Sequence, residues 1–253
     1  MSKTKEQPQK EQNAGQVAWE WIKSGIIGFM IFLVVRTFLI QTFTIVSGSM
    51  ENTLLIGDFL VLNKSAYGAT VPVLGKRLPG YDTPDRGDII VFVGYHECGG
   101  SAEQCKANRK DPIDLVKRLV GMPGDTLRMT DGELFINSQP APDEHVRHTN
   151  PSDGGHPWMT EWQTRYLTDS AAAQPYYPTR DNWGPIVVPE GRYFVLGDNR
   201  DESLDSRYWG FIEGPQIKGR AVALYFSYDT RSPGGGIPIV SRIRWGRIGD
   251  RLK

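Results

Sequence analysis

Cysteine and histidine are scarce in this chain of 253 residues, which contains two Cys and four His. Metal sites built from these residues need closely spaced ligands, and no CxxC motif occurs. The four histidines stand apart from the segments with strand-like patterns: His96, His145, His148 and His156. We therefore expect no metal site and no cofactor.

The two cysteines, Cys98 and Cys105, lie close together on either side of a Gly-Gly turn. In an oxidising compartment, two cysteines at this separation can close a small disulfide loop. The alternative is a pair of free thiols. The sequence favours the disulfide but leaves both states open.

An excess of charge of either sign is also missing, because 29 Lys and Arg balance 29 Asp and Glu. Nucleic-acid binding depends on neutralising phosphates, so we expect no nucleic-acid partner. Hydrophobic residues make up only 39% of the chain, which excludes a polytopic membrane protein. With 28 Gly and 17 Pro, the composition favours a turn-rich β protein over a helical bundle.

One long apolar segment is present near the start of the chain. Residues 25–35 contain no polar side chain, and Arg36 follows them. A span of about 20 residues is long enough to cross a bilayer. Ending the span at Arg36 keeps this charge away from the membrane centre, where it costs roughly 2.5–3.5 kcal/mol. We predict a transmembrane anchor over residues 17–36, preceded by a tail of residues 1–16.

The orientation of this anchor follows from the basic residues around it. Residues 37–56 contain no Lys or Arg, whereas four lysines lie within or before the anchor: Lys3, Lys5, Lys10 and Lys23. The positive-inside rule places the tail in the cytoplasm and the rest of the chain outside it. A cleaved secretory signal is the alternative, but no small-x-small cleavage site follows the apolar run, so we expect an uncleaved anchor.

The remainder of the chain has the pattern of β-strands. Short runs rich in Val, Ile, Phe and Tyr are bounded by turn residues; they cover residues 54–64, 86–95, 114–122, 126–138, 191–198 and 219–228. Within them, Asp131-Gly132 predicts a two-residue hairpin. The strand pattern is absent between residues 137 and 184, which predicts a loop-rich insertion.

Two polar features could supply chemistry. Ser47 and Ser49 flank Gly48 just after the anchor, which on its own is ordinary loop composition. In the strand over 114–121, alternation puts Lys117 and Arg118 on opposite apolar faces. Burial lowers the pKa of a lysine, and a neutral amine can serve as a general base for a serine. The alternative is a lysine whose amine reaches solvent at a sheet edge.

Two further charged segments each leave two interpretations open. Residues 197–210 alternate acids and arginines between apolar flanks, which indicates a loop fixed by ion pairs, the alternative being a solvated loop. The end of the chain interleaves Trp245 with basic residues, which suits either a solvated tail or contact with anionic lipid headgroups; these are Arg242, Arg244, Arg247, Arg251 and Lys253.

Four motifs occur in order behind the anchor: SGSM at 47–50, RGDIIVF at 86–92, KRLVGMPGD at 117–125 and GDNRDESLDSRYWGF at 197–211. Together they resemble bacterial signal peptidase I, over residues of about 32 to 226. The resemblance implies a mainly β fold: an antiparallel β catalytic core over 37–125 and 193–253, with an inserted loop-rich β subdomain over 126–192.

The resemblance also implies an activity and a location. Members of this family are membrane-bound serine endopeptidases with a Ser–Lys dyad, and they cleave N-terminal signal peptides from exported preproteins after small-x-small sites. The expected partners are preprotein signal peptides and the phospholipid bilayer, with no indication of oligomeric state. The expected location is the bacterial inner membrane, with a single span and the catalytic domain on the extracytoplasmic side.

Carried over by motif position, the resemblance makes Ser49 the nucleophile and Lys117 the general base. The Ser47 hydroxyl and the Ser49 N–H form the oxyanion hole, and Ser203 orients the lysine amine. Four charged residues near the site are implied to be structural: Arg118, Asp198, Asp205 and Arg207.

The chain departs from the family pattern at Val46 and Asn52, where prolines are usual. Their loss puts the rigidity of the segment around Ser49 in doubt but removes no reacting group. Two alternative functions remain. One is a Ser–Lys membrane peptidase with a dedicated substrate, as in pilus maturation, and the other is a catalytically silent, membrane-tethered binding module.

Overall fold

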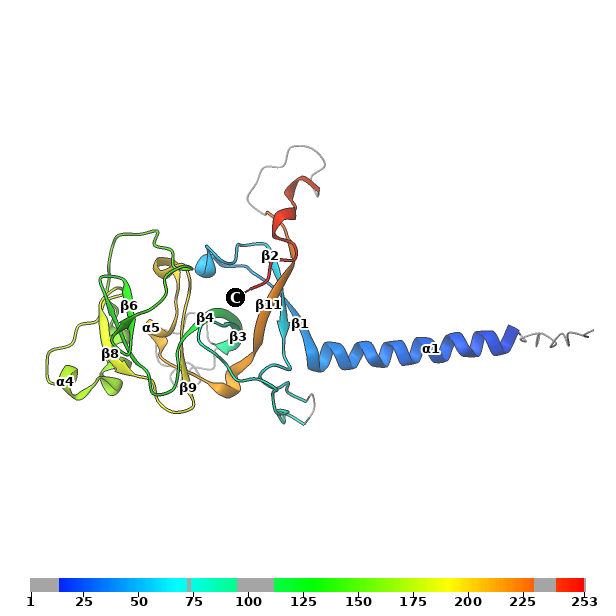
Figure 1. Cartoon of the computed structure of the whole chain (residues 1–253), viewed down its shortest axis with the longest axis horizontal. Coiled ribbons are helices and arrows are strands. Elements are labelled where there is room, and N and C mark those ends of the chain that lie inside the picture. Colours follow the sequence, from blue (N-terminus) through cyan, green and yellow to red (C-terminus); the bar gives the residue numbers. More distant parts are fainter. Residues whose placement is uncertain (1–13, 72–73, 95–111, 230–239, 253) are drawn as a thin grey trace, which may run out of the picture.

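The apolar N-terminal segment forms helix α1 (Ala14–Val34), which continues into a π-helical turn, η1 (Val35–Leu39). The computed structural model describes residues 14–71, 74–94, 112–229 and 240–252. In it, α1 projects away from the remainder of the protein (Figure 1). The stretch Gly15–Leu39 is long and apolar enough to cross a membrane, and none of it is buried inside the protein.

The helical segment ends later than the sequence indicated. We expected the anchor to stop at Arg36, with a strand or surface segment from residue 37, but helical structure continues to Leu39. Two contacts explain the difference. The Lys64 amine donates a hydrogen bond of 2.6 Å to the Thr37 carbonyl, and strand pairing begins only at Ile40, which lies opposite Asn63.

The described residues form two antiparallel sheets, and the larger has seven strands in the order β1-β2-β11-β3-β4-β9-β10. The strands are β1 (Ile40–Thr44), β2 (Asp58–Asn63), β3 (Ile89–Gly94), β4 (Ile113–Gly121), β9 (Arg192–Leu196), β10 (Ile212–Glu213) and β11 (Ile217–Ser227). Each predicted strand of the core is present. In the pairing of β3 with β4, Lys117 lies opposite Ile90 and Arg118 opposite Ile89, so the two cations leave opposite faces.

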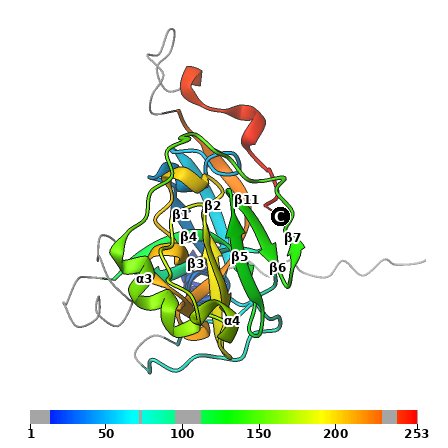
Figure 2. The same cartoon turned by 90° about the vertical axis from the view of Figure 1, so that its left-hand side faces the viewer.

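The smaller sheet has four strands and belongs to the inserted segment, 126–192. Its order is β7 (Gln139–Pro140), β6 (Glu133–Ile136), β5 (Thr126–Thr130) and β8 (Trp183–Val187). Asp131 and Gly132 join β5 to β6 with φ values of 49° and 81°, which confirms the hairpin. Figure 2 shows this sheet beside helices α3 (Pro157–Gln163) and α4 (Asp169–Ala172), which the sequence had left as loop.

Both faces of the large sheet are covered by apolar side chains. Ile89 and Val91 of β3 belong to one buried cluster with Met50 and Leu54, whereas Ile90 and Phe92 point into a second cluster. Their alternation follows the two-residue period of a strand. A third cluster, which includes Trp162 and Phe194, fills the space between the small sheet and α3. The site described next lies where β1, β4 and the segment after β9 meet.

Candidate active site

Ser49 lies in a single turn of 3-10 helix, η2 (Gly48–Met50), which follows β1. We call residues 47–54 the serine turn. It is closed by hydrogen bonds from Glu51 N to Gly48 O, 3.0 Å, and from Leu54 N to Met50 O, 2.7 Å. The Met50 and Leu54 side chains are buried in the core beneath it, so the apolar residues of this segment fix the serine. The Ser49 hydroxyl is 3.4 Å from that of Ser47.

Lys117 occupies the middle of β4 and is only 3% exposed. Burial lowers its pKa to about 8, because the surroundings solvate an ammonium poorly. Asp205 opposes this shift, whereas the nearby positive charge of Arg207 adds to it. The amine therefore changes between its charged and neutral forms within the physiological range of pH, as the burial argument predicts.

Ser47, Ser49 and Lys117 line one cavity of about 230 Å³. Its remaining walls are mostly apolar and come from the residues after β1, from β4, and from α5 (Ser206–Trp209) with the residues before it; they include Ile45, Val46, Leu115, Val116, Leu204 and Trp209. The fold thus brings together a hydroxyl pair and a buried amine that are far apart in the sequence. An apolar wall also weakens solvation of any charge that forms there.

Arg118, the neighbour of Lys117, is held by an ion pair. Its Nε and Nη2 donate to the two carboxylate oxygens of Asp198 at 2.8 and 2.7 Å. Asp198 also accepts a hydrogen bond of 2.5 Å from the Thr53 hydroxyl. This bidentate pair connects β4 and the serine turn to residues 197–207, which we call the polar loop.

A second ion pair lies inside the polar loop. Asp205 and Arg207 are completely buried and form two hydrogen bonds of 2.8 and 2.9 Å. Burial by itself raises the pKa of Asp205, but the adjacent Arg207 guanidinium outweighs this and lowers it. The loop is therefore fixed by ion pairs, and the interpretation as a solvated loop is wrong.

Gly197 allows the polar loop to approach the serine turn. A Cβ at this position would lie 2.2 Å from Ser203 Oγ and 2.4 Å from the Ser49 carbonyl oxygen, which only glycine avoids. Ser203 Oγ is buried and, among the described residues, has no hydrogen-bond partner. The expected hydrogen bond from Ser203 to Lys117 is thus not formed here, and the orienting role of Ser203 stays a prediction.

Asn199 contributes to the site, although the sequence analysis did not single it out. Its backbone N–H donates to Ser49 O at 3.1 Å, and its side-chain amide donates to Gly48 O at 3.3 Å. Asn199 thereby holds the carbonyls of Gly48 and Ser49 in place. Its position inside the GDNRDES motif, directly after Asp198, was the available signal.

Two basic residues near the end of the chain, Arg244 and Arg247, contact the serine turn and the residues next to it. Arg247 donates to the buried carboxylate of Asp58 at 2.6 Å and to the Thr53 carbonyl at 2.8 Å. Arg244 donates to the Ile56 carbonyl at 3.0 Å and forms an ion pair with Asp229 at 3.2 Å. Both interpretations from the sequence, a solvated tail and contact with lipid headgroups, are therefore wrong for Arg244 and Arg247, because their guanidinium groups bind other parts of the protein.

One of the sequence predictions, the disulfide, falls on a segment without a described structure. Cys98 and Cys105 both lie outside the described residues, so their pairing stays a prediction. Within the described part of the chain, no group of three or more His, Cys, Asp or Glu side chains could hold a metal ion.

Comparison with known proteins agrees with the motifs. Residues 18–226 match the family described as "Signal peptidase, peptidase S26". Three relatives named "Signal peptidase I" are 35% identical over 228 residues (Pseudomonas fluorescens), 33% over 222 residues (Pseudomonas aeruginosa) and 31% over 222 residues (Bacillus licheniformis). These matches cover 83%, 83% and 87% of this chain, and 72%, 72% and 95% of the respective relatives.

Proposed function

Because the chain belongs to the peptidase S26 family of signal peptidases and is a serine endopeptidase, we propose that it removes N-terminal signal peptides from exported preproteins. We propose that the bond cleaved lies directly after a small-x-small site, that Ser49 is the nucleophile and that neutral Lys117 is the general base. One observation carries this assignment: Ser49 shares a cavity with a buried lysine whose pKa is lowered to about 8.

In the first step, the Ser49 hydroxyl attacks the carbonyl carbon of the scissile bond and Lys117 takes its proton. The Ser49 N–H and the Ser47 hydroxyl stabilise the oxyanion, and losing one such donor typically costs about 10²–10³ in rate. Collapse of the tetrahedral intermediate transfers the proton from Lys117 to the leaving amine. A water deprotonated by Lys117 then hydrolyses the acyl-enzyme and restores the Ser49 hydroxyl.

The neighbouring cation cannot replace this base. Arg118 is about as buried as Lys117, but its guanidinium stays protonated in proteins and is held by both oxygens of Asp198. For Lys117, burial outweighs the attraction of Asp205 and lowers the pKa to about 8, so its proton can leave. We assign Arg118, Asp198, Asp205 and Arg207 to supporting the polar loop and not to the chemistry.

The N-terminal helix suits a substrate that is itself held in a membrane by its apolar segment. We propose that α1 anchors the protein in the bacterial inner membrane, with its N-terminus in the cytoplasm and the sheets on the extracytoplasmic side. The helical segment ends at Leu39 and the serine turn follows after the short strand β1, which keeps Ser49 near the bilayer surface. The proposed partners are signal peptides and phospholipids.

The proposal is tested with purified full-length protein in detergent and one preprotein that has an Ala-x-Ala site. We expect the wild type to release the mature protein, with a new N-terminus directly after the second Ala. Ser49→Ala and Lys117→Ala should each abolish cleavage, whereas Ser170→Ala and Lys76→Ala, two exposed control positions, should leave it unchanged.

The alternatives give different results in the same assay. A silent binding module leaves the preprotein intact with every variant. A peptidase with a dedicated substrate ignores this preprotein but cleaves its own substrate in a manner that depends on Ser49. Wild-type rates with Ser49→Ala or with Lys117→Ala would exclude the proposed dyad.

A further inference from the structure

The inserted segment reaches the polar loop next to the serine. Arg147 N donates to Asp198 O at 2.8 Å, and Arg200 N donates to Arg147 O at 2.9 Å. Arg147 and Asn199 thus form an isolated parallel bridge, which places residues 145–150 alongside the loop residue that holds Ser49 and Gly48. The backbone of the insertion is in this way connected to the candidate active site.

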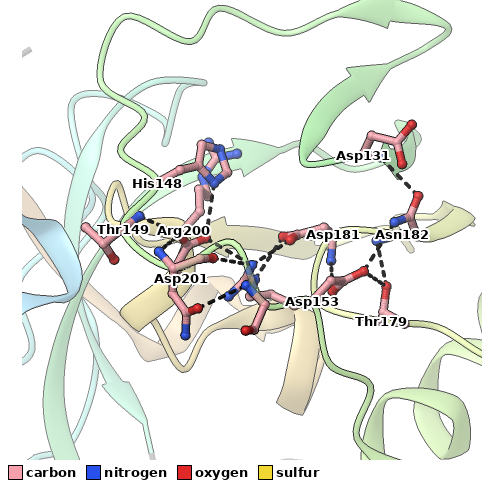
Figure 3. A network of polar contacts seen from close by, with 12 residues as sticks. Asp131, His148, Thr149, Asp153, Thr179, Asp181, Asn182, Arg200 and Asp201 are labelled. Carbon is pink, nitrogen blue, oxygen red and sulfur yellow. Dashed lines mark hydrogen bonds and ion pairs between the residues drawn. The ribbon is translucent and has the colours of Figure 1, made fainter.

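A polar network fixes this part of the insertion in place (Figure 3). The carboxylate of Asp201, whose side chain is fully buried, accepts hydrogen bonds from the backbone N–H groups of Thr149 and Asn150. His148 Nδ1 lies 3.1 Å from the same carboxylate, and Arg180 lies 3.4 Å from it. Although burial opposes it, these donors lower the pKa of Asp201, so the carboxylate is charged and the connection is strong.

The Arg147 side chain leaves the network and contacts the serine turn. Its Nη1 donates to Glu51 Oε2 at 3.1 Å, and the Glu51 side chain is only 15% exposed. A Cβ at Gly48 would lie 3.3 Å from Glu51 Oε1, so this carboxylate lies over the residue that precedes Ser49. The Glu51 N–H also closes the turn on Gly48 O.

Thr149, two residues further on, acts on the same turn through Asn199. Its hydroxyl donates to Asn199 Oδ1 at 3.3 Å, which leaves the amide nitrogen of Asn199 to face Gly48 O. Among the described residues, Arg147 thus reaches the serine turn directly at Glu51, and Thr149 reaches it indirectly by way of Asn199 of the polar loop.

We propose that Arg147 is a positioning residue for the Ser49 nucleophile and acts through its ion pair with Glu51. This inference rests on the proposed function. Because Arg147 is 45% exposed, the pair adds little to overall stability. The rate is more sensitive, since a misplacement of about 1 Å in a reacting group can cost about 10²-fold.

The first test is steady-state cleavage of a peptide that carries the preprotein site. Arg147→Ala should lower kcat roughly tenfold and leave KM unchanged, because Arg147 does not line the cavity. The pH midpoint of the activity should also stay the same, since Arg147 does not act on Lys117. Arg147→Lys should recover part of the loss. The melting temperature should be unaltered in each variant.

Arg165→Ala is the matched control. Arg165 belongs to the same insertion and pairs with an exposed carboxylate, Glu161, at 4.0 Å. The Arg165→Ala variant should have the same kcat as the wild type. A loss in Arg165→Ala as large as that in Arg147→Ala would overturn the proposal, because it would show a general disturbance of the insertion.

A double-mutant comparison tests the route of the effect. Glu51→Gln should lower kcat about as much as Arg147→Ala, and the double variant should be no slower than either single one. Fully additive losses, or an unchanged kcat in Arg147→Ala, would overturn the positioning role. Ser49→Ala distinguishes failure of the proposed function from failure of the role of Arg147. If Ser49→Ala cleaves like the wild type, both proposals are wrong. If it is inactive, the Arg147 and Glu51 variants test the positioning role alone.

Discussion

At the scale of single residues, Lys117 and Arg118 show how one strand gives two cations different chemistry. Both are almost fully buried. Arg118 keeps its charge and gains a bidentate partner in Asp198, whereas burial lowers the pKa of Lys117 to about 8. Arg118, whose charge stabilises the polar loop, and Lys117, whose amine can accept a proton, are thus adjacent in the sequence but point to opposite faces of the sheet.

The pKa of Lys117 predicts how activity depends on pH. Only the neutral amine can accept the Ser49 proton, so kcat/KM should be low in acid and rise with a midpoint near pH 8. Initial rates between pH 6 and 10 measure this limb. Lys117→Arg should be inactive throughout, and a midpoint near the ordinary lysine value of about 10.5 would contradict the prediction.

The same shift predicts a cost in stability. Between pH 8 and about 10.5 the unfolded chain binds a proton at Lys117 that the folded protein does not, so the stability of the wild type rises with pH across this window. Below pH 8 the full penalty applies, about 3 kcal/mol. Lys117→Met should therefore melt at a higher temperature than the wild type at pH 7, with a difference that shrinks towards pH 10.

The control for this stability prediction is an exposed lysine. Lys76→Met should show no comparable gain in melting temperature at pH 7. A Lys117→Met protein that is less stable than the wild type at pH 7 would show that the buried ammonium is not a source of instability.

At the scale of elements, the serine turn departs from the family at Asn52. This residue has a φ of 101°, which a proline ring, fixed near −65°, cannot adopt. The backbone at position 52 of this chain therefore does not accept the proline that the family pattern predicts there. The next residue, Thr53, donates to Asp198, so the unusual backbone at Asn52 sets the direction of a contact to the polar loop.

Substitution of Asn52 tests this difference. Asn52→Pro should destabilise the protein by about 3 kcal/mol and lower the rate of cleavage, because the turn must change shape. Asn52→Gly should raise the melting temperature slightly, since glycine tolerates a positive φ. Asn52→Ala should have a lower melting temperature than Asn52→Gly. Thermal unfolding in detergent measures all three, and a stable, active Asn52→Pro protein would contradict the observed turn.

Elements with local signals could be predicted from the sequence, and those that depend on distant partners could not. The hairpin at Asp131-Gly132 follows from turn chemistry, and the strand over Lys117 follows from its apolar pattern. By contrast, the end of the helical segment at Leu39 depends on the pairing of β1 with β2 and on Lys64. The sequence does not show which residues meet in such contacts.

The candidate site divides in the same way. Alternation placed Lys117 on an apolar face, but the pairing of Ser49 with it, and the role of Ser203, came from the resemblance to a family. Asn199 was missed although it stands inside the GDNRDES motif, because the sequence does not show that its side-chain amide meets Gly48 O and its backbone N–H meets Ser49 O. The ion pair of Arg147 with Glu51 spans 96 positions, and nothing local to either residue indicates the other.

At the scale of the whole molecule, the anchor and the sheets predict a topology. The apolar surface of α1 is exposed, and the nearby lysines lie before it in the sequence or within its first half: Lys3, Lys5, Lys10 and Lys23. Protease added to intact spheroplasts should therefore remove the part of the chain after Leu39, while a cytoplasmic marker protein stays whole. Protection of that part until the cells are lysed would contradict the orientation.

The ion pair between Asp58 and Arg247 has a consequence for how the enzyme matures. The two residues are 189 positions apart, and Arg247 also supports the Thr53 carbonyl of the serine turn. During synthesis, Asp58 and the serine turn are made long before Arg247, which supports them. In the proposed topology, a nascent molecule therefore has an incomplete candidate site until Arg247 has been synthesised and has reached Asp58 and the serine turn.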